Sequence, residues 1–309
     1  VLHCDTPARE SRRMRRALLC ATAAVVLLVA CPPTARAAGW VLPSVPLYDP
    51  GSEGFNASEV DAAIGADGGV VVVWVGSFPC PNPWCDEQLF ARRIAPDGTL
   101  GPVEHVSDDV SPGDAAEPQI AAAPDGTYGV VWQEQPPSTT TRVYFRRLDA
   151  HGVPLGAGRI PLSAGGDRAF WPQIAFDADS SALVVWAFGE SDPDDLDTVQ
   201  ARRISATDTP SPHTIPLYRE PDDDEVHGPP GLALDPDGNA LVTWRVEDIE
   251  GDTGDLQVWA RRLDATEDTS DEADLAHAAI PLSDPGGSVT APRVAMDPAG
   301  VATIVWVRM

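Results

Sequence analysis

The sequence predicts an all-β protein folded as a five-bladed β-propeller, and two observations carry this prediction. One pattern recurs five times without a gap: Pro-x-apolar-Ala, then x-x-x-Asp-Gly, then a hydrophobic run that closes on Trp. The five copies end on Trp74, Trp132, Trp186, Trp244 and Trp306. Successive tryptophans are 58, 54, 58 and 62 residues apart, and a long period rich in β-branched residues is typical of repeated β units.

Each repeat predicts four short strands. The first is the Pro-x-apolar-Ala segment, such as residues 118–121, and a tight turn follows at Pro124-Asp125-Gly126, where Gly supplies a positive φ. The second strand runs into Trp, as in residues 70–74, and its continuous apolar character indicates burial on both faces. The third carries an Arg pair, as in residues 90–94. The fourth, as in residues 160–162, holds a Pro that is typical of an outer edge.

The two ends of the repeat array are out of phase. Val45-Pro46-Leu47 matches the fourth strand but precedes the first repeat, whereas residues 301–306 reach only the second strand of a fifth repeat. We therefore expect residues 45–47 to complete the sheet that contains 301–306, so that an N-terminal strand closes the last blade and removes the open edges. Residues 40–309 would then form a single propeller domain of about five repeats.

Residues 1–39 predict a signal peptide with an N-terminal extension. Four Arg precede an apolar run over residues 17–30, which is too short to span a bilayer comfortably, and Ala35-Arg36-Ala37 matches a cleavage site. Leu28-Val29-Ala30-Cys31 is similar to a lipobox, so lipidation of Cys31 is the alternative. We expect a secreted, extracellular protein, or else one anchored to the cell surface by lipid, with no other attachment to a membrane.

Charge and cysteine content narrow the partners. The chain has 47 acidic residues, 21 Arg and no Lys, for a formal net charge of -26. Such a surface repels nucleic acid, and we expect a monomer whose partner is a protein or a glycan. Beyond residue 39 only Cys80 and Cys85 remain, and export to an oxidising compartment predicts a local disulfide between them.

The motifs resemble a repeat of secreted bacterial β-propeller proteins, which runs roughly G-G-x-x-V-V-W and then Y-A-x-R-F-D-A-x-G. Here the matching segments are residues 68–74, which end in Val-Val-Val-Trp, and residues 90–98, which contain Ala-Arg-Arg. The similarity covers most of residues 45–309. It implies the propeller fold and no particular activity, because members are mostly of unassigned function.

Candidate binding residues are few. The five repeated tryptophans are expected to fill the core between blades, whereas Trp84 and Trp171 break the pattern and are the candidates for ligand binding. Two acidic loops offer carboxylates of the kind that Ca²⁺ prefers, but without the spacing of a dedicated loop. We therefore expect no metal or other cofactor, with these loops as the alternative: Asp194, Asp195, Asp222, Asp223 and Asp224.

No nucleophile, zinc-protease, Walker or dinucleotide motif occurs in the sequence, and no catalytic residue is assigned. Some five-bladed propellers are glycoside hydrolases that use carboxylates near the central axis. On the first strands the acidic residues available for that role are Glu59, Asp61, Asp114 and Glu117. The leading interpretation is a binding or interaction module rather than an enzyme. The alternatives are a glycoside hydrolase with axis-facing carboxylates and a structural surface repeat protein.

Overall fold

The computed structural model of the chain describes ten segments, and all structural statements below refer to them. They are residues 46–47, 56–77, 87–107, 113–135, 140–164, 168–189, 198–219, 225–248, 255–284 and 287–309. No helix in these segments is long and apolar enough to cross a membrane. The prediction of an all-β protein is confirmed, since the only helix described is the single 3₁₀ turn η1 (Glu272–Asp274).

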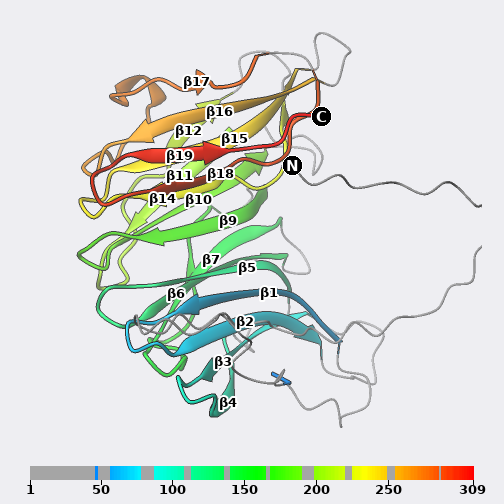
Figure 1. Ribbon diagram of the computed structural model, residues 1–309, viewed down its shortest axis with the longest axis vertical. Helices are drawn as coiled ribbons and strands as arrows, with labels where there is room; N and C mark the ends of the chain where they lie inside the picture. Colours follow the sequence, from blue (N-terminus) through cyan, green and yellow to red (C-terminus); the bar gives the residue numbers. More distant parts are fainter. Residues whose placement is uncertain are drawn as a thin grey trace, which may run out of the picture.

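Three sheets have four antiparallel strands, each paired with its neighbour in the chain (Figure 1). Sheet 1 contains β1 (Asn56–Ile64), β2 (Val70–Ser77), β3 (Gln88–Ile94) and β4 (Leu100–His105). Sheet 2 contains β5 (Asp114–Ala122), β6 (Tyr128–Gln135), β7 (Arg142–Leu148) and β8 (Ile160–Pro161). Sheet 3 contains β9 (Arg168–Phe176), β10 (Ala182–Gly189), β11 (Thr198–Ile204) and β12 (Ile215–Arg219).

The last two sheets depart from this plan. In sheet 4 the first strand is interrupted, so β13 (Glu225–Val226) and β14 (Gly231–Leu234) both pair with β15 (Ala240–Asp248). This sheet continues through β16 (Asp255–Leu263) to β17 (Ile280–Pro281). Sheet 5 has two described strands, β18 (Arg293–Met296) and β19 (Ala302–Val305).

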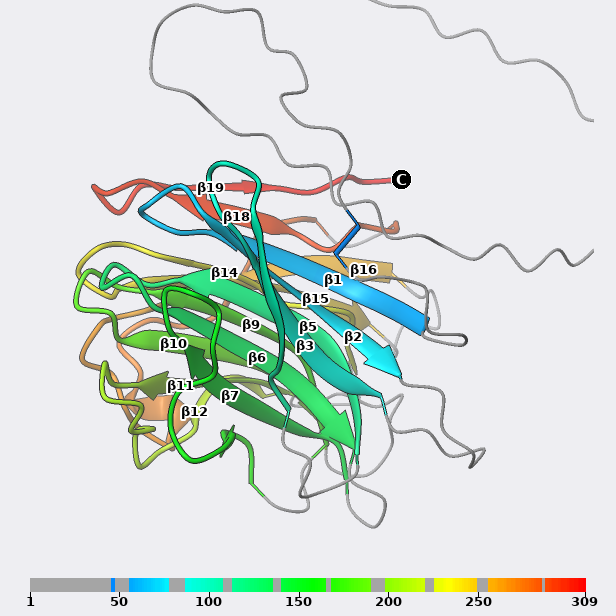
Figure 2. The same cartoon turned by 90° about the horizontal axis from the view of Figure 1, so that it is seen from below.

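The first strands of successive sheets lie side by side in the order β1, β5, β9, β14 and β18 (Figures 1 and 2). The sheets form a propeller-like arc that does not close into a ring, so five closed blades are not confirmed. Of the segment expected to close the last blade, Leu47 is described, and it packs in sheet 1 against Val70, Val72, Trp74 and Phe90. Sheet 5 has no third strand among the described residues.

The tryptophans that end the second strands fill the core as predicted. Trp132, Trp186 and Trp244 are fully buried, and Trp74 nearly so. Neighbouring residues of β2 face opposite ways: Val71 and Val73 pack towards sheet 2, and Val72 and Trp74 pack towards Leu47. A second strand buried on both faces explains why its sequence is apolar without alternation.

The Arg pairs of the third strands lock adjacent sheets together. The first Arg of each pair points back: Arg202 Nη1 donates to the carbonyl of Leu162 at 2.8 Å. The second points forward: Arg203 donates to the carbonyls of Gly238 at 3.3 Å and Asp264 at 2.7 Å. The expectation of one bonded and one solvated Arg is therefore wrong for this pair, because both faces of a third strand are covered by neighbouring sheets.

Candidate functional site

Three first strands carry the same backbone irregularity, 15 residues before the tryptophan of their sheet. Glu59, Glu117 and Trp171 have φ values of 48°, 51° and 53°. In each sheet the pairing of the first two strands shifts register at this point. The left-handed region is unfavourable for residues with a Cβ, at roughly 1–3 kcal/mol for a strained residue. Bulges of this kind re-aim a side chain.

Side chains from one sheet bind the bulged backbone of the next. The Glu117 N–H donates to Oε2 of Glu59 at 2.6 Å, and the Trp171 N–H donates to Oε1 of Gln133 at 2.9 Å. These bonds cross from sheet 1 to sheet 2 and from sheet 2 to sheet 3. The three bulged residues therefore form one continuous row, which we call the bulge row.

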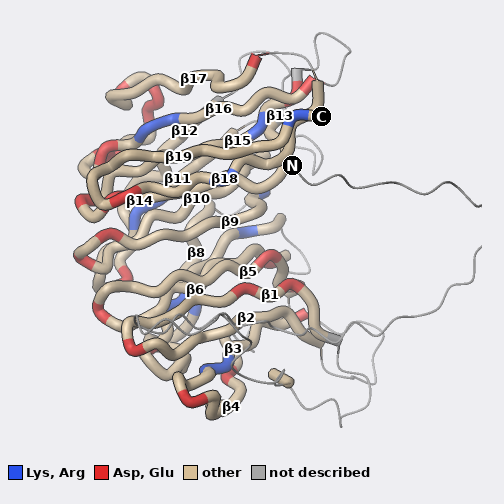
Figure 3. Tube along the Cα trace, viewed as in Figure 1, with Lys and Arg blue, Asp and Glu red and all other residues tan. Residues whose placement is uncertain are grey.

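Further carboxylates lie beside the first two members of the bulge row. The Glu87 N–H donates to Oδ1 of Asp114 at 3.2 Å, and the Ala115 N–H donates to the Glu87 carbonyl at 2.8 Å. Acidic residues are visible along β1 and β5 in Figure 3. Asp61 serves the junction itself, because its Oδ2 accepts the N–H of Ile120 at 2.9 Å.

Burial and mutual repulsion favour the protonated form of these carboxyls. Burial raises the pKa of Glu117, and the charge of Glu59 raises it further. Burial also raises the pKa of Glu87, with added repulsion from Asp114 and Glu59. The pKa of Asp61 is raised by burial against the opposing pull of backbone N–H groups. The bulge row thus offers carboxyls that hold protons at higher pH than usual.

The separation of Glu59 and Glu117 suits acid–base chemistry. Glu59 Oε2 is 2.6 Å from the Glu117 nitrogen, and the carboxyl carbon of a glutamate lies at most about 5 Å from its own nitrogen. Their carboxyl groups are therefore within about 8 Å of each other, which overlaps the separations found in glycoside hydrolases.

Trp171, predicted as a ligand-binding residue, is the third member of the bulge row. It is half-buried, unlike the fully buried tryptophans of the second strands, and its ring centroid is 6.2 Å from that of Phe170 at an interplanar angle of 50°. The other predicted site residues lie outside the described residues, namely Trp84, Cys31, Cys80, Cys85, Asp194, Asp195, Asp222, Asp223 and Asp224. Within the described segments, no group of three His, Cys, Asp or Glu side chains could hold a metal ion.

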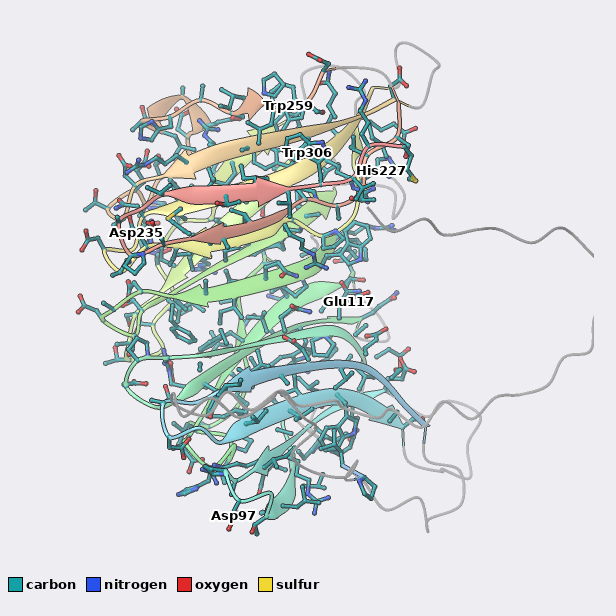
Figure 4. All side chains as sticks on the ribbon, in the orientation of Figure 1. Asp97, Glu117, His227, Asp235, Trp259 and Trp306 are labelled. Atoms are coloured by element: carbon teal, nitrogen blue, oxygen red, sulfur yellow. The ribbon has the colours of Figure 1, made fainter. Side chains whose placement is uncertain are left out.

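Sheet 4 contributes a different pair to the same end of the strands. His227 Nε2 lies 2.6 Å from Oε2 of Glu247, and Figure 4 shows His227 towards the same end as Glu117. Sequence reasoning missed this pair and Glu87 because they stand where strands meet variable loops, with no recurring spacing. The bulge row itself had a signal, since its members share one alignment position.

A cavity of about 330 Å³ lies at the other end of the strands. Phe176, Leu234 and Met296 contribute apolar side chains to it, and Asp177, Asp235 and Asp297 contribute carboxylates. Each carboxylate already accepts the N–H groups of its own turn, as Asp177 Oδ1 does from Asp179 and Ser181. Turn formation therefore accounts for these aspartates.

Comparisons with known proteins identify the fold and no family. No protein-family model matches the chain, and no curated protein does. A solved α-L-arabinanase of Penicillium chrysogenum, complexed with arabinobiose, is similar in fold: the TM-score is 0.55 at 15% identity over 82% of this chain and 75% of that one. An α-L-arabinofuranosidase of Fusarium graminearum with an iminosugar inhibitor gives a TM-score of 0.55 at 14% identity, over 84% and 76% of the two chains.

Proposed function

We propose that this chain is a carbohydrate-active protein that binds a glycan at the bulge row and hydrolyses a glycosidic bond with Glu59 and Glu117. The observation that carries the proposal is the row itself: two carboxylates and a half-buried tryptophan, all on strained backbone at one position of three adjacent sheets. Of the interpretations offered by the sequence, this favours the hydrolase alternative over the leading one of a binding module.

The two glutamates suit different roles. Glu117 is the general acid, because its pKa is raised by burial and by the charge of Glu59. It gives its proton to the glycosidic oxygen as the bond from that oxygen to the anomeric carbon breaks. The Glu59 carboxylate stabilises the positive charge that develops on the sugar ring. It then either accepts a proton from the attacking water or bonds to the anomeric carbon, depending on the separation of the two carboxyls.

Trp171 supplies a surface for the sugar ring. An indole offers a large flat apolar face, which packs against the C–H groups of a pyranose or furanose. Repeated tryptophans in this fold are core residues, but Trp171 stands at a first-strand bulge and keeps part of its side chain accessible. The fold likeness to an arabinanase and an arabinofuranosidase supports the choice of a carbohydrate.

Hydrolysis of arabinobiose, arabinan and a panel of neutral polysaccharides tests the proposal. E117Q and E59Q should each lower kcat/KM by about 10²-fold or more, and W171A should chiefly raise KM. D179N is the matched control, because Asp179 is an exposed carboxylate in the turn between β9 and β10, at the far end of β9 from Trp171. Glycan binding without hydrolysis, unchanged in E59Q and E117Q, would return the chain to the class of binding modules. Neither binding nor hydrolysis would refute the proposal altogether.

A further inference from the structure

The back-pointing arginines of the third strands make one recurring contact. Arg146, Arg202 and Arg261 each donate from Nη1 to a carbonyl on the fourth strand of the preceding sheet, or just after it. The acceptors are Val106 at 2.7 Å, Leu162 at 2.8 Å and Leu217 at 2.8 Å. Arg92 makes the same contact to the carbonyl of Leu47, at 2.6 Å. Leu47 therefore occupies a fourth-strand position in front of sheet 1.

Leu47 also has the sequence of a fourth strand. Val45-Pro46-Leu47 matches Ile160-Pro161-Leu162 and Ile215-Pro216-Leu217. It is buried against Trp74 and Phe90 of sheet 1. In the described residues it belongs to no sheet of its own, whereas Leu162 and Leu217 complete sheets 2 and 3. The chain thus holds a fourth strand that lacks the rest of its sheet.

The opposite end of the arc shows the complementary gap. β19 and its flanks expose Val301, Val305 and Val307 to 63%, 58% and 59%. The forward-pointing Arg262 of sheet 4 is 55% exposed and pairs with Asp264 of its own sheet, whereas Arg147 of sheet 2 is 4% exposed and bonds Asp208 of sheet 3. Sheet 5 therefore lacks, among the described residues, the outer strands that cover the corresponding residues elsewhere.

We propose that residues 40–47 of the same chain form a hairpin that docks on β19 and supplies the third and fourth strands of sheet 5. The occupant is this segment rather than a second copy, because Leu47 is already fixed on sheet 1 by Arg92 and joins β1 through only residues 48–55. A tethered segment has a high effective concentration at its site.

The register of the hairpin follows from the complete sheets. The second-strand tryptophan faces the residue two before the Arg pair, as Trp132 faces Tyr144 and Trp244 faces Trp259. That residue in turn faces the fourth-strand proline, as Tyr144 faces Pro161 and Trp259 faces Pro281. The same pairing places Trp40 opposite both Trp306 and Pro46, and Val41 opposite both Val305 and Val45. The intervening residues 42–44 form a three-residue hairpin loop, a common length.

Docking of this hairpin has a consequence for the bulge row. Because residues 46–47 also pack on sheet 1, the hairpin brings sheet 5 against sheet 1 and closes the ring. Arg293 takes the place in sheet 5 that Asp61 takes in sheet 1, and it is exposed. Since Asp61 reaches across to the next first strand, Arg293 then faces β1 beside Asp61 and Glu59. A cation at that end of the row stabilises the ionised form of Glu59.

A disulfide between V41C and V305C tests the register in the full chain. Directly opposed residues of antiparallel strands have Cα atoms about 4.5–5.5 Å apart, within the range of a disulfide. The matched control is V41C with V301C, which is equally exposed but four residues out of register. V305C alone controls for exchange with Cys80 or Cys85. Every basic residue is Arg, so tryptic fragments 37–92 and 294–308 report the bond by mass.

We expect a monomeric cross-linked product from V41C/V305C and none from either control. Absence of the bond, or a bond only between two chains, would overturn the proposal. Hydrogen exchange gives a second measurement: amides of residues 302–305 should be protected in the wild type and lose protection in V41P, while those of β10 stay unchanged as a check that the fold persists. Fast exchange at 302–305 in the wild type would also overturn it.

Discussion

Replacing the turn glycines Gly126 and Gly238 with alanine separates two reasons why these turns need glycine. Both residues have a left-handed backbone, with φ of 88° and 86°, and both stand at the same position of the repeat. They differ in their surroundings. A Cβ at Gly126 would meet nothing within 4 Å, whereas one at Gly238 would lie 3.3 Å from Oδ2 of Asp177 and 3.4 Å from Cβ of Ala265.

The expected magnitudes follow from these surroundings. G126A carries only the conformational cost of alanine in the left-handed region, about 1–2 kcal/mol. G238A carries the same cost and in addition crowds sheet 3, because Asp177 belongs to the turn of that sheet and holds Ser181 N–H at 2.9 Å. We expect G238A to be more destabilising than G126A by roughly 1 kcal/mol, within the range for overpacking.

Urea unfolding followed by tryptophan fluorescence measures both variants against the wild type. The slope of the free energy of unfolding on urea should be unchanged, so that the midpoints report stability directly. Equal loss in the two variants would show that the approach of sheet 3 to the sheet 4 turn is not tight. No loss in G126A would contradict the conformational argument itself and, with it, the assignment of this turn.

Two further predictions concern acid and cysteine chemistry. Because the pKa values of Asp61 and Glu117 are raised in the folded protein, folding binds protons at these carboxyls. Their contribution to stability is therefore greatest below their ordinary pKa and is lost as the pH rises through the raised values. D61N/E117Q should gain stability relative to the wild type on going from about pH 4 to about pH 7, and a constant difference between the two proteins in urea unfolding would exclude it. Intact mass with and without reductant should show one disulfide between Cys80 and Cys85, and two free thiols in exported protein would refute that pairing.

The recurring features of the structure were open to prediction from sequence because each depends on local chemistry. A turn that needs a positive φ selects Gly, as at Gly126 and Gly238, and a strand covered on both faces selects a continuous apolar run, as in residues 70–74. These constraints repeat with the tryptophans, so alignment of the copies reveals them. The row of Glu59, Glu117 and Trp171 shares an alignment position for the same reason.

Features that depend on a neighbouring sheet escaped prediction. The burial of Arg147 and Arg203 follows from the turn of the next sheet lying over each third strand, which no pattern within one repeat reports. Conversely, Arg262 is exposed with the same local sequence, because sheet 5 lacks outer strands in the described residues. The His227–Glu247 pair likewise depends on the interruption of the first strand of sheet 4 between β13 and β14.

The strained backbone of the bulge row is not a requirement of the fold. At the corresponding position sheet 4 has Pro229, whose ring locks φ near about −65° and forbids the left-handed region. Sheet 5 has Ala291, which is not among the described residues with positive φ. Both sheets nevertheless form their first and second strands. The repeat therefore folds without the bulge, and the strain at Glu59, Glu117 and Trp171 is additional to what folding needs. Strain of this kind persists where it positions a side chain for a task, which is the role that the proposed glycan site gives to all three residues.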